Sequence, residues 1–324
     1  METTCCDYCG NIESTLVARQ TDKLHNTTDY VFNIVRCSSC GLHYTNPRPS
    51  ADEIGRYYST SYSFHGVPSR LRIKATSIIS KLANGPLAPF ADIFPAIGRK
   101  LATHVKPSIA DPVAMFYKLG QQGSFLDIGC GAGVSAHYWG IDGALASYKR
   151  LFKVAGVEVS PRAREALLSA DIESWPNIHD VPDNRKFGII RMNWSLEHVH
   201  SPSRYFSFMS NHLIPGGKII IAVPNYDGLL YKIAPDCVEL PIHLYHFRPQ
   251  DLTNYAKKYG FCVDSLVTFS YPDMFIAAAK ANMLPASFAY HRTLKYARQF
   301  QLFLNKLDFV FWGNDMIAIL SHDK

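Results

Sequence analysis

A glycine-rich segment in the middle of the chain has the residue types and spacing needed to hold a nucleotide-like ligand. The segment reads Phe-Leu-Asp-Ile-Gly-Cys-Gly-Ala-Gly over residues 125–133. Gly129, Gly131 and Gly133 carry no Cβ atom, so the chain can turn tightly and its backbone can approach a ligand closely. A dinucleotide-binding loop would need a glycine one residue further on, where Val134 stands. We therefore predict a strand that ends in a sharp turn against a ligand other than a dinucleotide.

A second buried strand is predicted over residues 153–159, and it carries Glu158 near its carboxyl end. In an α/β sheet, ligands bind at the carboxyl ends of the strands, where a carboxylate can accept hydrogen bonds from both hydroxyls of a ribose. Acidic residues also favour helix N-termini, and the pair Ser160-Pro161 is typical of a helix start. Glu158 therefore has two candidate roles, ribose binding and helix capping, of which we favour ribose binding.

The Asp-x-Gly-x-Gly-x-Gly pattern resembles motif I of class I S-adenosylmethionine-dependent methyltransferases. The resemblance implies that the acid of this pattern orders the loop around the amino-acid end of the cofactor, and a turn-stabilising role is the alternative. The cofactor contacts that we expect on this basis are Asp127, Gly129, Cys130, Gly131, Gly133, Glu158 and Asn193.

From residue 124 onward, apolar strand-like runs alternate with helix-like stretches, as in a largely parallel sheet with helices on both faces. The stretch His-Leu-Ile-Pro-Gly-Gly-Lys-Ile-Ile-Ile-Ala-Val-Pro-Asn at 212–225 resembles a signature of class I methyltransferases. Residues 261–268 and 315–321 resemble the family's final antiparallel hairpin, with a helical insertion at about 273–306. We predict an α/β fold of the class I methyltransferase (Rossmann-like) type, with a mostly parallel sheet and a terminal antiparallel hairpin.

The N-terminal part contains two Cys-x-x-Cys pairs among the eight cysteines of the chain. Two such pairs can place four thiolates around one tetrahedral zinc ion, and a glycine after each pair lets the chain turn there. Disulfides and unrelated buried thiols are the alternatives. Two residues separate Cys6 from Cys9, whereas three separate Cys5 from Cys9. The predicted structural zinc ligands are therefore Cys6, Cys9, Cys37 and Cys40.

The segment that follows the second cysteine pair, Cys-Gly-Leu-His-Tyr-Thr-Asn-Pro-Arg-Pro-Ser at 40–50, resembles the leader of one methyltransferase subgroup. Members of that subgroup carry a zinc ribbon and often accompany sugar or polysaccharide biosynthesis. We expect a zinc ribbon over 1–50, a helical connector or lid over 51–118, and an S-adenosylmethionine-binding methyltransferase domain over 119–324. A ribbon can also bind nucleic acid or proteins, so it does not by itself choose a substrate.

Two further segments carry candidate catalytic residues. Asn-Trp-Ser-Leu-Glu-His at 193–198 follows a predicted strand and resembles a "LEHV" element of the family, and His-Leu-Tyr-His-Phe at 243–247 resembles an "HxxHF" element. Imidazole titrates near neutral pH, so His198 or His243 could take a proton from the methyl acceptor, with Glu197 beside them. Structural histidines that fix the loops are the alternative.

A catalytic metal is a further alternative for these residues. Small-RNA 2′-O-methyltransferases and some quinone-pathway O-methyltransferases are similar here and use a Glu-x-x-Glu-His element. Trp194 stands in the place of the first glutamate. This leaves only a few candidate ligands for a divalent ion, namely Glu197, His198 and His243 or His246. The prediction of a proton-accepting histidine is therefore favoured over a metal site.

Composition sets broad limits on the function. The 324 residues are 47% hydrophobic and 19% charged, which is typical of a globular protein with one large core and a smaller module. We find no apolar run long enough for a membrane span and no signal-peptide pattern, so we expect a cytoplasmic protein. The net charge of +6 is scattered along the chain, so nucleic acid is not favoured as a partner. We expect an enzyme with a small-molecule acceptor; an RNA methyltransferase and a non-catalytic binding protein are the alternatives, and the oligomeric state stays open.

Overall fold

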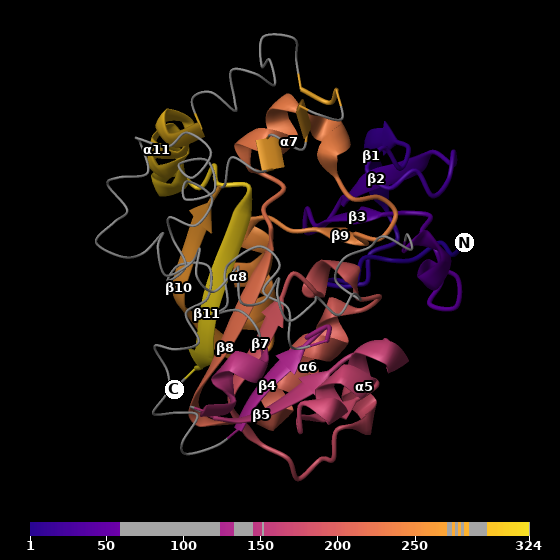
Figure 1. Ribbon diagram of the computed structural model, residues 1–324. Helices are drawn as coiled ribbons and strands as arrows, with labels where there is room; N and C mark the ends of the chain where they lie inside the picture. Colours follow the sequence, from indigo (N-terminus) through magenta and orange to yellow (C-terminus); the bar gives the residue numbers. More distant parts are fainter. Residues whose placement is uncertain are drawn as a thin grey trace.

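The computed structural model describes residues 1–58, 124–132, 145–150, 152–270, 274–275, 278–279, 282–284 and 297–323. The larger of its two sheets has the strand order β10-β11-β8-β7-β4-β5-β6 (Figure 1). Its strands are β4 (Ser124–Ile128), β5 (Lys153–Val157), β6 (Glu173–Trp175), β7 (Phe187–Asn193), β8 (Leu213–Pro224), β10 (Phe261–Phe269) and β11 (Asp315–His322).

Strands β4 to β8 of this sheet run parallel, and β11 is inserted antiparallel between β8 and β10. The central strand β4 pairs with β5 on one side and with β7 on the other. This arrangement confirms the predicted α/β fold with a mostly parallel sheet and a terminal antiparallel hairpin. The carboxyl ends of β4, β5, β7 and β8 therefore lie along one edge of the sheet.

Helices follow the strands where the sequence places proline after a polar residue. Ser160 caps α5 by accepting a hydrogen bond from the Ala163 amide at 3.3 Å, and prolines also begin α6 and α8. Within the described residues the α-helices are α5 (Pro161–Ser169), α6 (Pro202–His212), α7 (Leu229–Ile233), α8 (Pro249–Lys258) and α11 (Ala297–Leu307). Short 3₁₀ helices are η1 (Ile54–Tyr57), η6 (Leu145–Arg150), η7 (Ile178–Asp180), η8 (Leu196–His198), η9 (Pro235–Cys237) and η10 (Asp308–Val310).

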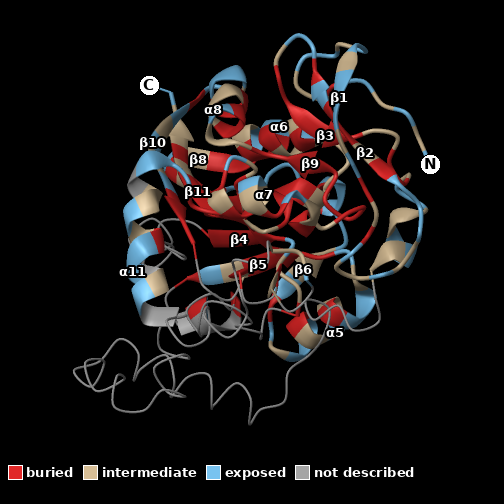
Figure 2. Ribbon diagram, turned by 90° about the horizontal axis from the view of Figure 1, so that it is seen from above, coloured by how far each residue is buried: buried red, intermediate tan, exposed pale blue. Residues whose placement is uncertain are grey.

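Alternate residues of the central strands enter two hydrophobic cores, because successive side chains of a strand point to opposite faces. On one face, Leu126 and Ile190 pack with side chains of α6 and α8. On the other face, Phe125 and Ile189 pack with side chains of η6 and α5. The sheet is therefore buried on both sides, as the band of buried residues through the centre of Figure 2 shows.

The smaller sheet combines the N-terminal strands with a strand from far along the chain. Its order is β1 (Ser14–Gln20), β2 (Phe32–Cys37), β3 (His43–Thr45) and β9 (Tyr245–His246), and all of its pairs are antiparallel. Figure 1 shows β9 beside the indigo N-terminal strands. The N-terminal segment is thus joined to the segment after β8 by backbone hydrogen bonds.

Some predicted features differ from the structure or fall outside its described part. The Pro-Gly-Gly residues of the 212–225 stretch, where a break before the strand is expected, belong to β8, which begins at Leu213 and pairs irregularly with β7. Only the first residues of the predicted connector, up to residue 58, are described, and they form η1. Half of the predicted insertion also lies outside the described residues, and α11 forms its end. Among the helices that are described, none has the length and apolarity to cross a membrane.

Candidate active site and cysteine cluster

Four cysteine sulfurs of the N-terminal segment converge on one point. The Sγ atoms of Cys6 and Cys40 lie 3.4 Å apart, and those of Cys9 and Cys37 lie 3.5 Å apart. A zinc ion with Zn–S bonds of about 2.3 Å needs sulfurs roughly 3.8 Å apart in a tetrahedron, so the donor set fits zinc. Cys5 is exposed and does not belong to this group.

The two cysteine pairs form matching turns. The amide of Gly10 donates to the Cys6 carbonyl at 2.8 Å, and the amide of Gly41 donates to the Cys37 carbonyl at 3.0 Å. Both glycines have positive φ angles, of 76° and 80°, which a residue with a Cβ atom adopts only with strain. The glycine after each pair is therefore explained by the turn that folds the cysteines inward.

The glycine-rich segment turns directly after β4, as predicted. Gly129 and Gly131 have φ angles of 79° and 56°. The Gly131 amide donates a hydrogen bond of 2.8 Å to Oε2 of Glu158, which lies just beyond the end of β5. The two predicted cofactor elements therefore touch each other, while Gly133 lies outside the described residues.

Glu158 is buried, with 4% of its surface exposed, and its second oxygen also has a backbone partner. Oε1 accepts a hydrogen bond of 2.8 Å from the Ser160 amide at the start of α5. Glu158 thus contacts both the glycine loop and the helix start. A carboxylate oxygen can accept more than one hydrogen bond, so these contacts are compatible with ribose binding.

Asp127 has a partner that sequence reasoning missed. Both of its carboxylate oxygens accept hydrogen bonds from Arg191 on β7, at 2.9 and 2.6 Å, and both side chains are buried. The guanidinium also lies 5.2 Å from the centre of the Phe125 ring and 5.7 Å from that of Tyr148. A charge in the apolar run of β7 was the signal for a buried partner. Asp127 therefore holds β4 against β7 below the glycine loop.

The glycine loop is in direct contact with the segment that carries the predicted catalytic residues. Ser195 donates a hydrogen bond of 2.8 Å to the carbonyl of Ile128. A Cβ atom on Gly129 would lie 2.5 Å from the Ser195 Cβ, so this glycine is required by the close approach of a protein segment. The sulfur of Cys130 packs against Gly156 of β5, where an added Cβ would lie 2.5 Å from it. Asn193 ends β7 and is half-buried at the same edge of the sheet.

Glu197, His198 and His243 lie together at this edge. The His198 Nδ1 atom contacts the Ile242 carbonyl at 3.0 Å, which places its proton on Nδ1 because a carbonyl only accepts. Its Nε2 atom faces Glu197 Oε1 at 3.8 Å, and the rings of His198 and His243 meet edge to face with centres 4.6 Å apart. One donor atom from each of the three residues lies within 4.8 Å of the others, so the group could hold a divalent cation.

Two further residues extend this group, and sequence reasoning missed the first of them, Glu239. Glu239 Oε2 lies 3.8 Å from His243 Nε2 and 3.3 Å from His25 Nε2. The spacing of Glu239 and His243, four residues apart, was the available signal. Tyr58 contacts His198 Nδ1 through its hydroxyl at 3.3 Å, so the end of the described N-terminal segment also reaches the group.

Burial sets the protonation of these residues. Burial lowers the pKa of His243, and the neighbouring Glu239 partly offsets this. Burial alone would raise the pKa of Glu239, but His243 and His25 lower it to about 2. Burial raises the pKa of Glu197 well above its usual range. At neutral pH, His243 is therefore a neutral imidazole beside a carboxylate, which can accept a proton.

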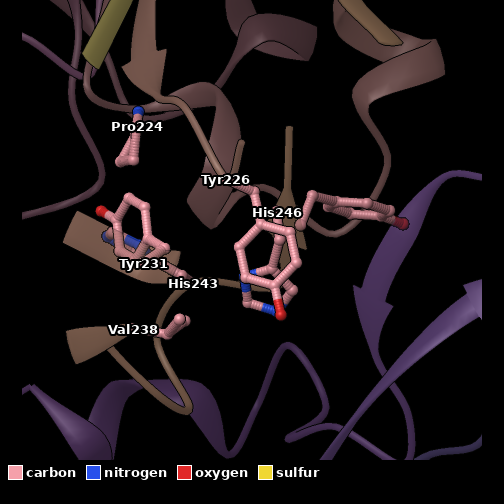
Figure 3. A pocket seen from close by; sticks show the side chains of 7 residues that line it. Pro224, Tyr226, Tyr231, Val238, His243 and His246 are labelled. Atoms are coloured by element: carbon pink, nitrogen blue, oxygen red, sulfur yellow. The ribbon is translucent and has the colours of Figure 1, made fainter. Parts of the chain in front are cut away.

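A small pocket adjoins the group (Figure 3). The Tyr226 ring lies 6.1 Å from that of Tyr231 and 5.4 Å from the imidazole of His246. His243 belongs both to the pocket wall and to the group described above, so a molecule in the pocket would meet an imidazole. The pocket is lined by Pro224, Tyr226, Tyr231, Val238, His243, Tyr245 and His246.

Comparison with solved structures finds distant likenesses. A SAM-dependent methyltransferase from Archaeoglobus fulgidus is 18% identical, with a TM-score of 0.44, and the match covers 65% of this chain and 92% of that one. The CcbJ methyltransferase from Streptomyces caelestis is 12% identical, with a TM-score of 0.44 and coverage of 67% and 90%. An S-adenosylmethionine-dependent methyltransferase from Clostridium acetobutylicum is 14% identical, with a TM-score of 0.42 and coverage of 74% and 100%. No curated protein matches the chain significantly.

The family is shown by the sequence itself. Residues 101–266 match the model of a family described as a methyltransferase domain, and this match spans more than half of the 324 residues. The matched range contains the glycine loop, Glu158 and the Glu197–His198 segment. The chain therefore belongs to the methyltransferase-domain family and is a methyltransferase.

Proposed function

We propose that the protein transfers a methyl group from S-adenosylmethionine to a small-molecule acceptor, a nucleotide-linked sugar or a polysaccharide precursor. The observation that carries this proposal is the contact between Ser195 and the turn at Ile128–Gly129. It joins the glycine loop to the segment that bears Glu197 and His198. A cofactor held by the loop and an acceptor beside the histidines would therefore be neighbours.

The cofactor supplies an electrophilic methyl group when it is bound. The residues that would hold it are the glycine loop, Glu158 and Asn193, because they lie at the carboxyl ends of adjacent parallel strands. The chain's remaining task is to align the acceptor and to exclude water. If the acceptor atom carries a proton, the neutral imidazole of His243 or His198 takes it.

The residue types around the pocket favour an acceptor that carries a ring, but the pocket itself has room only for a small group and does not enclose a ring. Tyrosine and histidine rings offer apolar faces to a sugar or aromatic ring, and their polar atoms can bond to its hydroxyls. The pocket wall includes three tyrosines and two histidines. Figure 3 shows Tyr226 and Tyr231 with His243 and His246 around the same space.

The cofactor site is tested by isothermal titration of S-adenosylmethionine into three variants. Glu158→Ala removes the carboxylate, and Gly131→Val places a branched side chain where φ is positive, so both should weaken binding at least tenfold. Glu165→Ala, on the exposed side of α5, is the matched control and should bind like the wild type. Unchanged affinity in both site variants would contradict the assignment.

The acceptor is tested with labelled methyl donor and a fractionated metabolite pool. A labelled sugar nucleotide or polysaccharide precursor would support the proposal. Labelling confined to RNA, with binding that falls steeply as salt rises, would overturn it in favour of the RNA alternative.

A further inference from the structure

We propose that the N-terminal ribbon, residues 1–50, forms part of the acceptor site, and that Thr45 is the residue through which it positions His243. Only the expected effect of Thr45 on catalysis rests on the proposed function. The structural coupling itself can be measured without any acceptor.

Thr45 ends β3 and makes three hydrogen bonds to the segment that carries His243. Its hydroxyl donates to the His243 carbonyl at 3.1 Å, and its amide donates to the Leu244 carbonyl at 2.9 Å. The same hydroxyl lies 3.1 Å from Nε2 of His246. Because the hydroxyl proton is used on His243, His246 must donate its Nε2 proton to Thr45.

The other side of this segment is tied to the catalytic group. The Leu244 amide donates a hydrogen bond of 2.8 Å to the carbonyl of Glu197. Leu244 therefore lies between the ribbon, which bonds to its carbonyl, and Glu197, which bonds to its amide. A shift of β3 must move His243 relative to Glu197 and His198.

A second contact reaches another side chain of the pocket wall. His43, at the start of β3, has its ring centre 5.2 Å from that of Tyr226, which lines the pocket. Tyr226 is thus held between His43 of the ribbon and His246 of β9. The ribbon supports both the imidazole and the aromatic side of the site.

The cysteine cluster lies next to these contacts along the chain. Cys40 lies three residues before the first residue of β3, and the Gly41 carbonyl accepts a hydrogen bond of 2.9 Å from Arg248, just beyond β9. A zinc ion on the four cysteines would hold the turn that leads into β3. Removal of the metal should therefore loosen β3 and, through Thr45, the His243 segment.

The experiment measures hydrogen–deuterium exchange of residues 240–248 in the full-length zinc-loaded protein. Thr45→Val keeps the side-chain shape and removes the hydroxyl, so exchange of this segment should rise at least tenfold while that of β4 stays unchanged. Thr45→Ser restores the hydroxyl and should restore the protection. Thr268→Val removes another buried hydroxyl, which bonds to the Asp308 carbonyl, and should leave residues 240–248 unchanged.

Zinc removal from the wild type by a chelator is the second arm. It should raise exchange in residues 240–248 as well as in the ribbon. Once an acceptor has been identified, Thr45→Val should lower kcat at least tenfold and leave the affinity for S-adenosylmethionine unchanged. Thr45→Ser should restore kcat.

Unchanged exchange of residues 240–248 after zinc removal would overturn the proposal even if Thr45→Val did not fold. Coupling in the exchange data without any methyl transfer would instead count against the proposed function alone.

Discussion

Buried carboxyl groups at the carboxyl end of the sheet are neutralised in different ways, and the difference separates structure from chemistry. Asp127 is paired with Arg191 through two hydrogen bonds, so its charge is compensated inside the protein. Within the described residues, both oxygens of Glu197 are buried without a hydrogen-bond partner. A buried ionised carboxylate without partners is costly, which agrees with a neutral Glu197 or with a cationic ligand beside it. Asp127 is therefore explained by the fold, whereas Glu197 is explained by the site.

Asp315 is a third buried acid, and its protonation should make stability depend on pH. Burial raises its pKa to about 7, and its Oδ1 atom accepts a hydrogen bond of 2.9 Å from Trp194. In the unfolded chain this acid ionises near pH 4, so between pH 4 and 7 only the folded state keeps the proton. The contribution of Asp315 to stability therefore falls as pH rises through this window and is constant above it.

Asp315→Asn should remove this pH dependence, because the amide can still accept from Trp194 and never ionises. As pH rises from 4 to 7, the free energy of unfolding of the variant should increase relative to that of the wild type. The relative increase should reach on the order of a few kcal/mol at pH 8. Urea unfolding across this range measures the difference. A difference that is independent of pH would contradict the assignment.

His243 should determine the acid limb of the activity profile. Burial lowers its pKa below the ordinary 6.5, and the base must be neutral to accept a proton. Activity should therefore persist below pH 6.5 and fall as His243 becomes protonated. His243→Asn should lower kcat by roughly 10²–10⁴-fold and abolish this limb.

The matched control for His243 is His179→Asn, at an exposed position. Its pH profile should equal that of the wild type. An acid limb that survives in His243→Asn would assign the proton to another group.

At the scale of elements, the strands and helices of the larger sheet could be predicted because their signals are local. The apolar run before Asp127 forms β4, and the prolines after Ser160 and Ser201 begin α5 and α6. The strand β9 could not be predicted, because its two residues pair with β3 from the opposite end of the chain. The candidate site was predicted only in part. His198 and His243 came from motifs, whereas the four-residue spacing of Glu239 and His243 indicates a contact only when the fold of that segment is known.

The turn after β4 offers a test of why its glycine is needed. Gly129 and Gly216 both have positive φ, of 79° and 76°, but an added Cβ would meet Ser195 only at Gly129. Gly216→Ala should cost about 1–2 kcal/mol from backbone strain alone. Gly129→Ala should cost a further ~1–3 kcal/mol, because Ser195 must move.

Denaturant unfolding of both variants compares the two costs, and titration of S-adenosylmethionine should show weaker binding only for Gly129→Ala. Equal destabilisation by the two substitutions would mean that the contact with Ser195 has no energetic weight.

At the scale of the whole molecule, the ribbon is joined to the methyltransferase part by more than the pairing of β3 with β9. Asp7, between the first two cysteines of the cluster, accepts hydrogen bonds from Ser201 Oγ at 2.6 Å, the Ser203 amide at 2.8 Å and the Tyr255 hydroxyl at 2.7 Å. These partners belong to the start of α6 and to α8, which cover one face of the larger sheet. The cysteine turn is thus bonded directly to the two helices that cover this face of the sheet.

This contact predicts that metal binding stabilises the whole chain and not the ribbon alone. Cys9→Ser removes one ligand, so zinc content should fall from about one equivalent to none, and the melting temperature of the methyltransferase part should fall with it. Cys5→Ser, at an exposed cysteine outside the cluster, should change neither quantity. Calorimetry with zinc analysis makes the measurement. Because Asp7 couples the cysteine turn to α6 and α8, the wild type should unfold in one transition. If the ribbon of Cys9→Ser instead unfolded in a separate, earlier transition and the main transition kept its melting temperature, the two parts would be energetically independent.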